Sequence, residues 1–148
     1  MTSDRASGGA RTRVADALSA VGSRSIVGFS LLVLVVSVVP VPGSSGGEAA
    51  FFTLSVGVDP FVASHLLAYA IIAGLCRRTL RERDFEVREV AVIAVVLAAG
   101  YGATIELLQV PIPWRSGGLF DAAINAVGAV VGVLVGTIAG ALARTSTR

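Results

Sequence analysis

The chain is poor in the residues on which several classes of site depend. It has a single cysteine, Cys76, which excludes an internal disulfide and a metal site built from cysteines. It also has a single histidine, His65, which excludes a zinc site with several histidines from one chain. Lysine is absent, and arginine supplies all 12 basic residues. We therefore expect no resident metal, and nothing in the sequence indicates a cofactor.

Apolar residues dominate what is present. They make up 54% of the 148 residues, and the mean hydropathy of +0.80 is too high for an ordinary soluble domain. Four apolar segments, at about 25–41, 60–76, 90–110 and 119–143, suit membrane-spanning helices. The sequence therefore predicts an all-α integral membrane bundle of four transmembrane helices between two tails, 1–24 and 144–148. We expect a multi-pass protein of the cell membrane with no nucleic-acid partner.

The first apolar segment has two interpretations. It is short for a membrane span and lies between an arginine-bearing start and small residues, which is also the pattern of a signal peptide. We expect a retained helix, because the stretch 40–47, rich in proline, glycine and serine, is typical of an external loop. A cleaved signal peptide is the alternative, and cleavage would leave the remaining topology unchanged.

The distribution of arginine predicts the orientation in the membrane. The N-terminal tail, the linker 77–89 and the C-terminus carry 4, 5 and 2 arginines, whereas the two opposite loops carry 0 and 1. Because positive residues collect on the cytoplasmic side, both termini are predicted to be cytoplasmic. In this interpretation Arg77 and Arg78 are solvated topology signals.

Most ionisable and amide side chains in or beside the apolar segments belong to the predicted outer face. Such groups are costly in hydrocarbon unless they have a partner, a water-filled cavity or a function. His65, Glu106 and Asp121 form a candidate catalytic acid/base cluster, since an imidazole and two carboxylates can exchange protons. The candidate ligand-binding residues are Arg115, Gln109, Asn125 and Asp59.

These residues also have structural interpretations. Asp59 precedes Pro60, which suits a first helical turn, so its carboxylate can cap the free amides there. Gln109 and Asn125 can form hydrogen bonds between helices, and Arg115 can lie in water. A polar network that fixes the register of the helices is the competing interpretation of the acid/base cluster.

A ladder of small residues continues down the last apolar segment from the face of Asp121 and Asn125. Small residues four apart let another helix approach closely. We expect the ladder to pack tightly within the chain, with contact between two copies as the minor alternative. Its members are Gly128, Gly132, Gly136 and Gly140.

The order of these polar residues resembles that of the VanZ-like membrane family. There, an Asp precedes a His and a Tyr, a Glu is followed by a Gln, and then come Arg, Asp, Asn and Gly. The chain resembles this pattern over roughly residues 55–140, although Gly117 and Gly118 replace a more apolar approach to the Asp. The matching residues are Asp59, His65, Tyr69, Glu106, Gln109, Arg115, Asp121, Asn125 and Gly128.

The resemblance implies a four-helix membrane protein. Founding members of the family are linked to low-level resistance to teicoplanin, a glycopeptide that acts on the cell envelope, and the family implies no particular reaction. We expect action at the outer face on the cell envelope, with an anionic lipid or lipid-linked precursor as the partner. Arg115 would engage the head group, His65 and Glu106 would transfer protons, and Asp121 would orient His65 or Arg115.

Two other functions stay open. The protein can be a non-enzymatic scaffold or accessory subunit that binds a partner membrane protein or a second copy through its glycine ladder. A transporter or proton relay also suits carboxylates within a membrane. It is the weaker idea, because four helices are few and no inverted internal repeat is visible.

Overall fold

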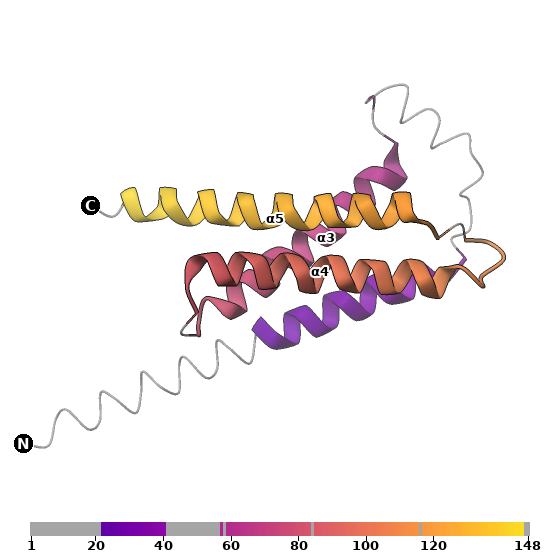
Figure 1. The fold of residues 1–148 in the computed structure, drawn as a ribbon, viewed down its shortest axis with the longest axis horizontal. Helices are drawn as coiled ribbons and strands as arrows, with labels where there is room; N and C mark the ends of the chain where they lie inside the picture. The colour runs from indigo at the N-terminus through magenta and orange to yellow at the C-terminus, as the bar shows by residue number, and fades with distance from the viewer. Residues whose placement is uncertain (1–21, 41–56, 58, 84, 116, 147–148) are drawn as a thin grey trace, which may run out of the picture.

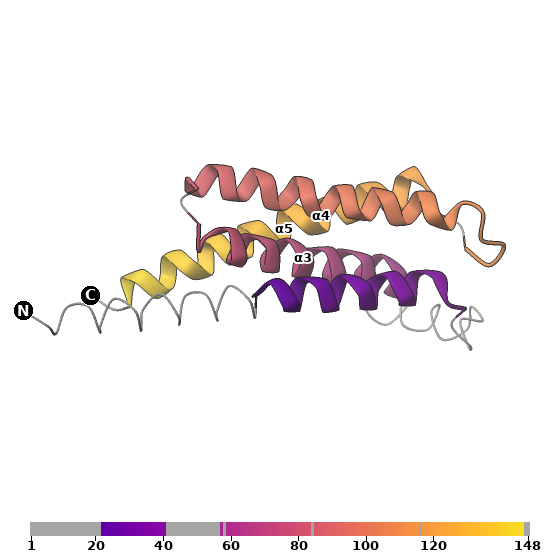
Figure 2. The same ribbon diagram turned by 90° about the horizontal axis from the view of Figure 1, so that it is seen from below.

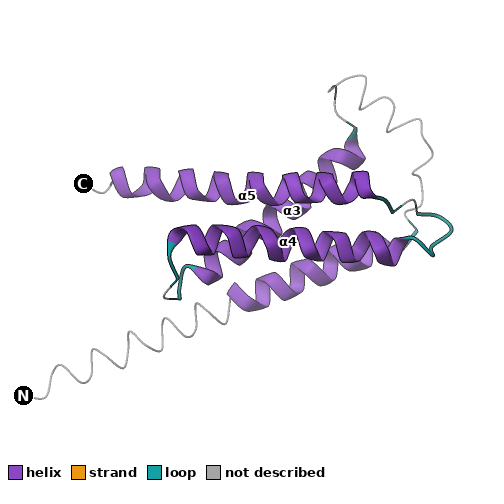
Figure 3. Ribbon diagram, in the orientation of Figure 1, coloured by secondary structure: helices purple, strands orange, loops and turns teal. Residues whose placement is uncertain are grey.

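Four helices and no strand make up the described part of the chain (Figures 1 and 3). The computed structural model describes residues 22–40, 57, 59–83, 85–115 and 117–146. The prediction of an all-α chain is confirmed for these residues. Most of the predicted N-terminal tail, the external loop 40–47 beyond Pro40 and the last two residues lie outside them. The helices are Gly22–Val38, α3 (Pro60–Leu80), α4 (Val87–Gln109) and α5 (Leu119–Thr145).

Three of these helices are long and apolar enough to cross a membrane. They are α3, α4 and α5, with 21, 23 and 27 residues. At about 1.5 Å per residue, each exceeds the roughly 30 Å of a bilayer's hydrocarbon core. The helix Gly22–Val38 is apolar but shorter than 18 residues. Large apolar side chains are exposed on every helix, as contact with lipid requires, including Leu31, Leu67, Val96 and Leu134.

Local sequence explains where α3 and α4 begin. The Asp59 side chain accepts a hydrogen bond of 2.7 Å from the backbone N–H of Phe61, and Pro60 occupies the first turn of α3. At the start of α4, Glu86 and Glu89 form a reciprocal capping box. The structural interpretation of Asp59 as a helix cap is therefore confirmed.

The helices extend beyond the predicted segments at the end of the bundle opposite Asp59. The sequence interpretation ends the second segment at Cys76, whereas α3 continues through Arg77 and Arg78 to Leu80. Arginine is a good helix former, so a charge that ends an apolar run need not end a helix. The other two helices likewise include an arginine near this end, Arg88 in α4 and Arg144 in α5. As a result α4 begins three residues earlier than predicted, at Val87, and α5 continues to Thr145.

The helices alternate in direction around a core of small residues. α3 and α5 run parallel, with α4 antiparallel to both and in contact with each (Figures 1 and 2). Four fully buried alanines lie between them, and Phe29 and Val33 of the helix Gly22–Val38 pack against the same core. Small side chains let the backbones approach closely, so van der Waals contact holds the bundle together. The alanines are Ala73, Ala94, Ala98 and Ala129.

The first two glycines of the ladder, Gly128 and Gly132, form the contact between α5 and α3. A Cβ atom on Gly128 would lie 2.5 Å from the carbonyl oxygen of Leu66. A Cβ atom on Gly132 would overlap the carbonyl oxygen of Ala70. The prediction of tight packing within the chain is confirmed for these two glycines. Gly136 and Gly140 instead face the side chains of Arg77, in the last turn of α3, and of Arg81, its C-cap.

We predict that Gly132→Ala destabilises the bundle, because the new methyl group would force the α3 and α5 backbones apart. The expected loss is about 1–3 kcal/mol of unfolding free energy, typical of overpacking. Thermal unfolding of the detergent-purified protein measures it. Gly100→Ala is the matched control, since nothing lies within 4 Å of its Cβ position. An equal response of the two variants would contradict the close contact.

Candidate functional site

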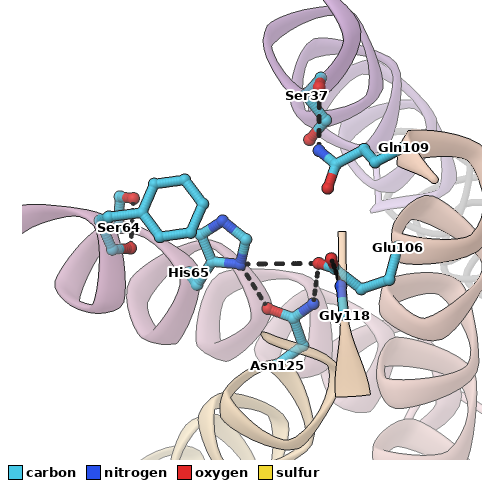
Figure 4. Close-up of polar contacts among 8 residues, drawn as sticks. Ser37, Ser64, His65, Glu106, Gln109, Gly118 and Asn125 are labelled. Atoms are coloured by element: carbon cyan, nitrogen blue, oxygen red, sulfur yellow. Dashed lines mark hydrogen bonds and ion pairs between the residues drawn. The ribbon is translucent and has the colours of Figure 1, made fainter. Parts of the chain in front are cut away.

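A chain of hydrogen bonds joins one side chain from each of α3, α4 and α5 (Figure 4). His65 Nδ1 lies 2.9 Å from Asn125 Oδ1, and Asn125 Nδ2 donates over 3.0 Å to Glu106 Oε1. Glu106 and Asn125 are buried, with exposed fractions of 4% and 0%, whereas His65 is partly exposed. We call this set the His65–Asn125–Glu106 relay.

The carboxylate of Glu106 has a partner for each oxygen. Besides the bond from Asn125 to Oε1, the backbone N–H of Gly118 donates to Oε2 over 3.2 Å. Gly118 caps the N-terminus of α5, and the positive end of a helix dipole stabilises a nearby anion. His65 Nδ1 is 3.9 Å from Oε1, within range of a direct charge interaction once the ring is protonated. The buried carboxylate is thus satisfied within the protein.

The relay fixes where His65 carries its proton. Because Asn125 uses its amide N–H to bond Glu106, it presents its carbonyl oxygen to His65. A carbonyl oxygen only accepts, so Nδ1 of His65 must donate. The neutral ring then has an unprotonated Nε2, which points away from Asn125 and Glu106 (Figure 4) and bonds no described residue. The Phe61 ring lies against the imidazole, with centroids 4.3 Å apart.

Glycines allow the three helices to meet here. A Cβ on Gly102 of α4 would lie 2.9 Å from both Asn125 Cβ and a ring carbon of Tyr69. A Cβ on Gly117 would overlap the carbonyl oxygen of Glu106. The loop between α4 and α5 can therefore turn back tightly and bring the Gly118 N–H to the carboxylate.

A second polar cluster attaches the helix Gly22–Val38 to the bundle. The Gln109 amide donates a hydrogen bond of 2.9 Å to the carbonyl oxygen of Ser37 (Figure 4). The Trp114 indole N–H donates a hydrogen bond of 3.2 Å to the carbonyl oxygen of Val38. Arg115 donates to the carbonyl oxygens of Val36 and Val39, over 2.5 and 2.9 Å. These are carbonyls that a helix C-terminus leaves without partners.

The structure thus separates residues that the sequence interpretation grouped. Gln109 and Arg115, two of the four expected ligand-binding residues, contact the chain's own backbone. Asp121 lies in the first turn of α5, one turn from Asn125, and no described residue forms a hydrogen bond or ion pair with its carboxylate. The residue of α5 that contacts His65 is therefore Asn125 and not Asp121.

Sequence reasoning missed three contributors to the site. They are Phe61, whose ring lies against the imidazole at a tilt of 39°, and the paired glycines Gly117 and Gly118. The glycine pair before α5 was a signal that could have been used, because adjacent glycines mark a close backbone approach. Among the described residues, no group of three or more His, Cys, Asp or Glu side chains could hold a metal ion.

Comparison of the chain with protein-family models, with curated proteins and with solved structures gave no match. The resemblance to the VanZ-like family therefore stays a prediction from the order of its polar residues.

We predict that Glu106→Gln lowers the unfolding free energy by about 1–3 kcal/mol. The new amide would place a donor against either the Asn125 amide or the Gly118 N–H, both of which are donors. The thermal unfolding midpoint in detergent measures the loss. Asp121→Asn is the matched control, and its effect should stay within about 0.5 kcal/mol, since no described partner is lost. Equal losses would contradict the relay.

Proposed function

We propose that this chain is a multi-pass membrane protein that acts on an anionic lipid or lipid-linked precursor of the cell envelope. In this proposal His65 is the proton acceptor. The supporting observation is that His65 is held through Nδ1 by Asn125, which leaves Nε2 unprotonated in the neutral ring. The VanZ-like order of polar residues is the reason for choosing the envelope.

The relay has the parts that a general base needs. Nε2 can take a proton from a hydroxyl or acid group of a bound molecule, and the ring then becomes positively charged. Glu106 stabilises that charge from 3.9 Å, and Asn125 keeps the ring in one orientation. Asn125 and Glu106 are positioning residues in this scheme, and His65 is the group that would contact the substrate.

We also propose four membrane spans with both termini in the cytoplasm and the relay end of the bundle facing outward. The support is the excess of arginine in the tails and in the linker 77–89. The hydrogen bonds from Gln109, Trp114 and Arg115 favour a retained first helix, since cleavage of that segment would remove the acceptors of all three donors, of which Gln109 is buried.

Cysteine labelling in intact cells tests this orientation. In a Cys76→Ala background, Leu119→Cys should react with a membrane-impermeant maleimide, because Leu119 is 92% exposed at the relay end. Arg83→Cys, in the exposed turn after α3, should react only after the cells are opened. Labelling of position 83 alone in intact cells would contradict the proposed orientation.

The single histidine allows a direct test of ligand contact at His65. Diethyl pyrocarbonate modifies unprotonated imidazole nitrogen, and its absorbance change at histidine reports His65 alone. We expect a polyprenyl phosphate to slow the modification of the detergent-purified protein by about fivefold or more, because a bound molecule would cover Nε2. His65→Gln, which removes the signal, is the control.

The alternative function is a non-enzymatic scaffold whose relay fixes the register of the helices. It is favoured by one observation, that both carboxylate oxygens of Glu106 already have protein partners. If neither polyprenyl phosphate nor phosphatidylglycerol slows the modification of His65, the proposal of a lipid substrate fails. The scaffold then becomes the better account, with a partner membrane protein or a second copy as its ligand.

A further inference from the structure

Arginine side chains gather at the end of the bundle opposite the relay. Arg77 and Arg81 belong to the last turn of α3 and its C-cap, 12 and 16 residues beyond His65. At about 1.5 Å per residue, Arg77 lies roughly 18 Å along α3 from the relay. The cluster is therefore a separate feature, and an inference from it does not depend on the function proposed for His65.

The last two glycines of the ladder, Gly136 and Gly140, make room for these side chains. Arg77 Nη1 lies 3.1 Å from the position that a Cβ on Gly136 would occupy. Arg81 Nη1 lies 3.0 Å, and Arg77 Nη2 3.8 Å, from the corresponding position on Gly140. Both guanidinium groups thus rest on the same glycine face of α5. Larger residues at these two positions would displace them.

Arg77 is unusual for a residue that was expected to be solvated. Only 8% of it is exposed, and both Arg81 and Arg144 repel its charge. No carboxylate of a described residue lies within 4.0 Å of its guanidinium. A buried cation is costly without an opposite charge, especially at the end of a membrane-spanning helix. A bound anion would supply the opposite charge that the described residues do not.

The cluster is also open to a ligand. An open depression at this end of α3 is lined by Arg77, Arg78, Arg81 and Glu82. Guanidinium groups form paired hydrogen bonds with phosphate oxygens, and basic pockets between membrane helices bind phospholipid head groups. We propose that Arg77 and Arg81, held on the Gly136–Gly140 face of α5, bind a phosphate group from an anionic phospholipid or from free phosphate.

Native mass spectrometry of the detergent-purified chain tests the site with phosphatidylglycerol and with zwitterionic phosphatidylcholine. We expect tighter binding of phosphatidylglycerol, and a loss of about tenfold in Arg77→Gln and in Arg81→Gln. Arg81 is exposed, so its variant should fold even if Arg77→Gln does not. Glu82→Gln should bind more tightly, because it removes a negative charge from the rim of the depression.

Arg83→Gln is the matched control, since Arg83 is exposed in the same turn and does not line the depression. Its affinity should stay within about twofold. An equal loss in Arg83→Gln and Arg81→Gln would overturn the site, because net charge alone would then explain binding. Equal affinity for the two lipids, with no stabilisation by phosphate, would overturn it as well.

A second measurement distinguishes the two sources of the phosphate. Thermal unfolding is compared in inorganic phosphate and in chloride at equal ionic strength, for the wild type and Arg81→Gln. Stabilisation by inorganic phosphate that Arg81→Gln abolishes assigns the site to free phosphate. Selective binding of phosphatidylglycerol without that stabilisation assigns it to a lipid head group.

Discussion

The burial of the Glu106 carboxylate is the constraint on which the polar end of this bundle depends. A carboxylate without partners would be very costly beside apolar helices, so the neighbouring helices α3 and α5 must supply partners. Asn125 supplies an amide and Gly118 a backbone N–H at the start of α5, and His65 Nδ1, which bonds Asn125, lies 3.9 Å from the carboxylate. The tight loop after α4 follows from this requirement. So does the orientation of His65, because Asn125 can satisfy Glu106 only by presenting its carbonyl oxygen to the ring.

The two ends of the bundle use one surface of α5 in different ways. Near the relay, Gly128 and Gly132 allow α3 to approach so closely that backbone meets backbone. Further down the helix, Gly136 and Gly140 accommodate the guanidinium groups of Arg77 and Arg81. The same small-residue ladder thus serves helix packing at one end and a cluster of positive charge at the other. Only the first use follows from the spacing of the glycines.

Helix class and approximate position could be predicted, because long apolar runs bounded by proline or arginine have few other structures available. The end of α3 at Leu80 could not be predicted, because arginine is typical of cytoplasmic segments and is also a good helix former. Within the site, spacing places Asp121 and Asn125 on one face of α5, yet only the axial register between α5 and α3 decides which of them meets His65. Gln109 and Glu106 are three residues apart on α4, but they turn to different neighbours, the helix Gly22–Val38 and α5. Sequence spacing carries no information on such tertiary choices.

Nitrogen-15 NMR of the histidine-labelled protein tests the central claim most directly, because His65 supplies the only signal. The relay predicts that the neutral ring carries its proton on Nδ1 and has an unprotonated Nε2. A neutral ring with its proton on Nε2 would contradict the account. Nδ1 would then be an acceptor, Asn125 would present its amide to His65, and its carbonyl oxygen would face Glu106. The carboxylate could not be held as described.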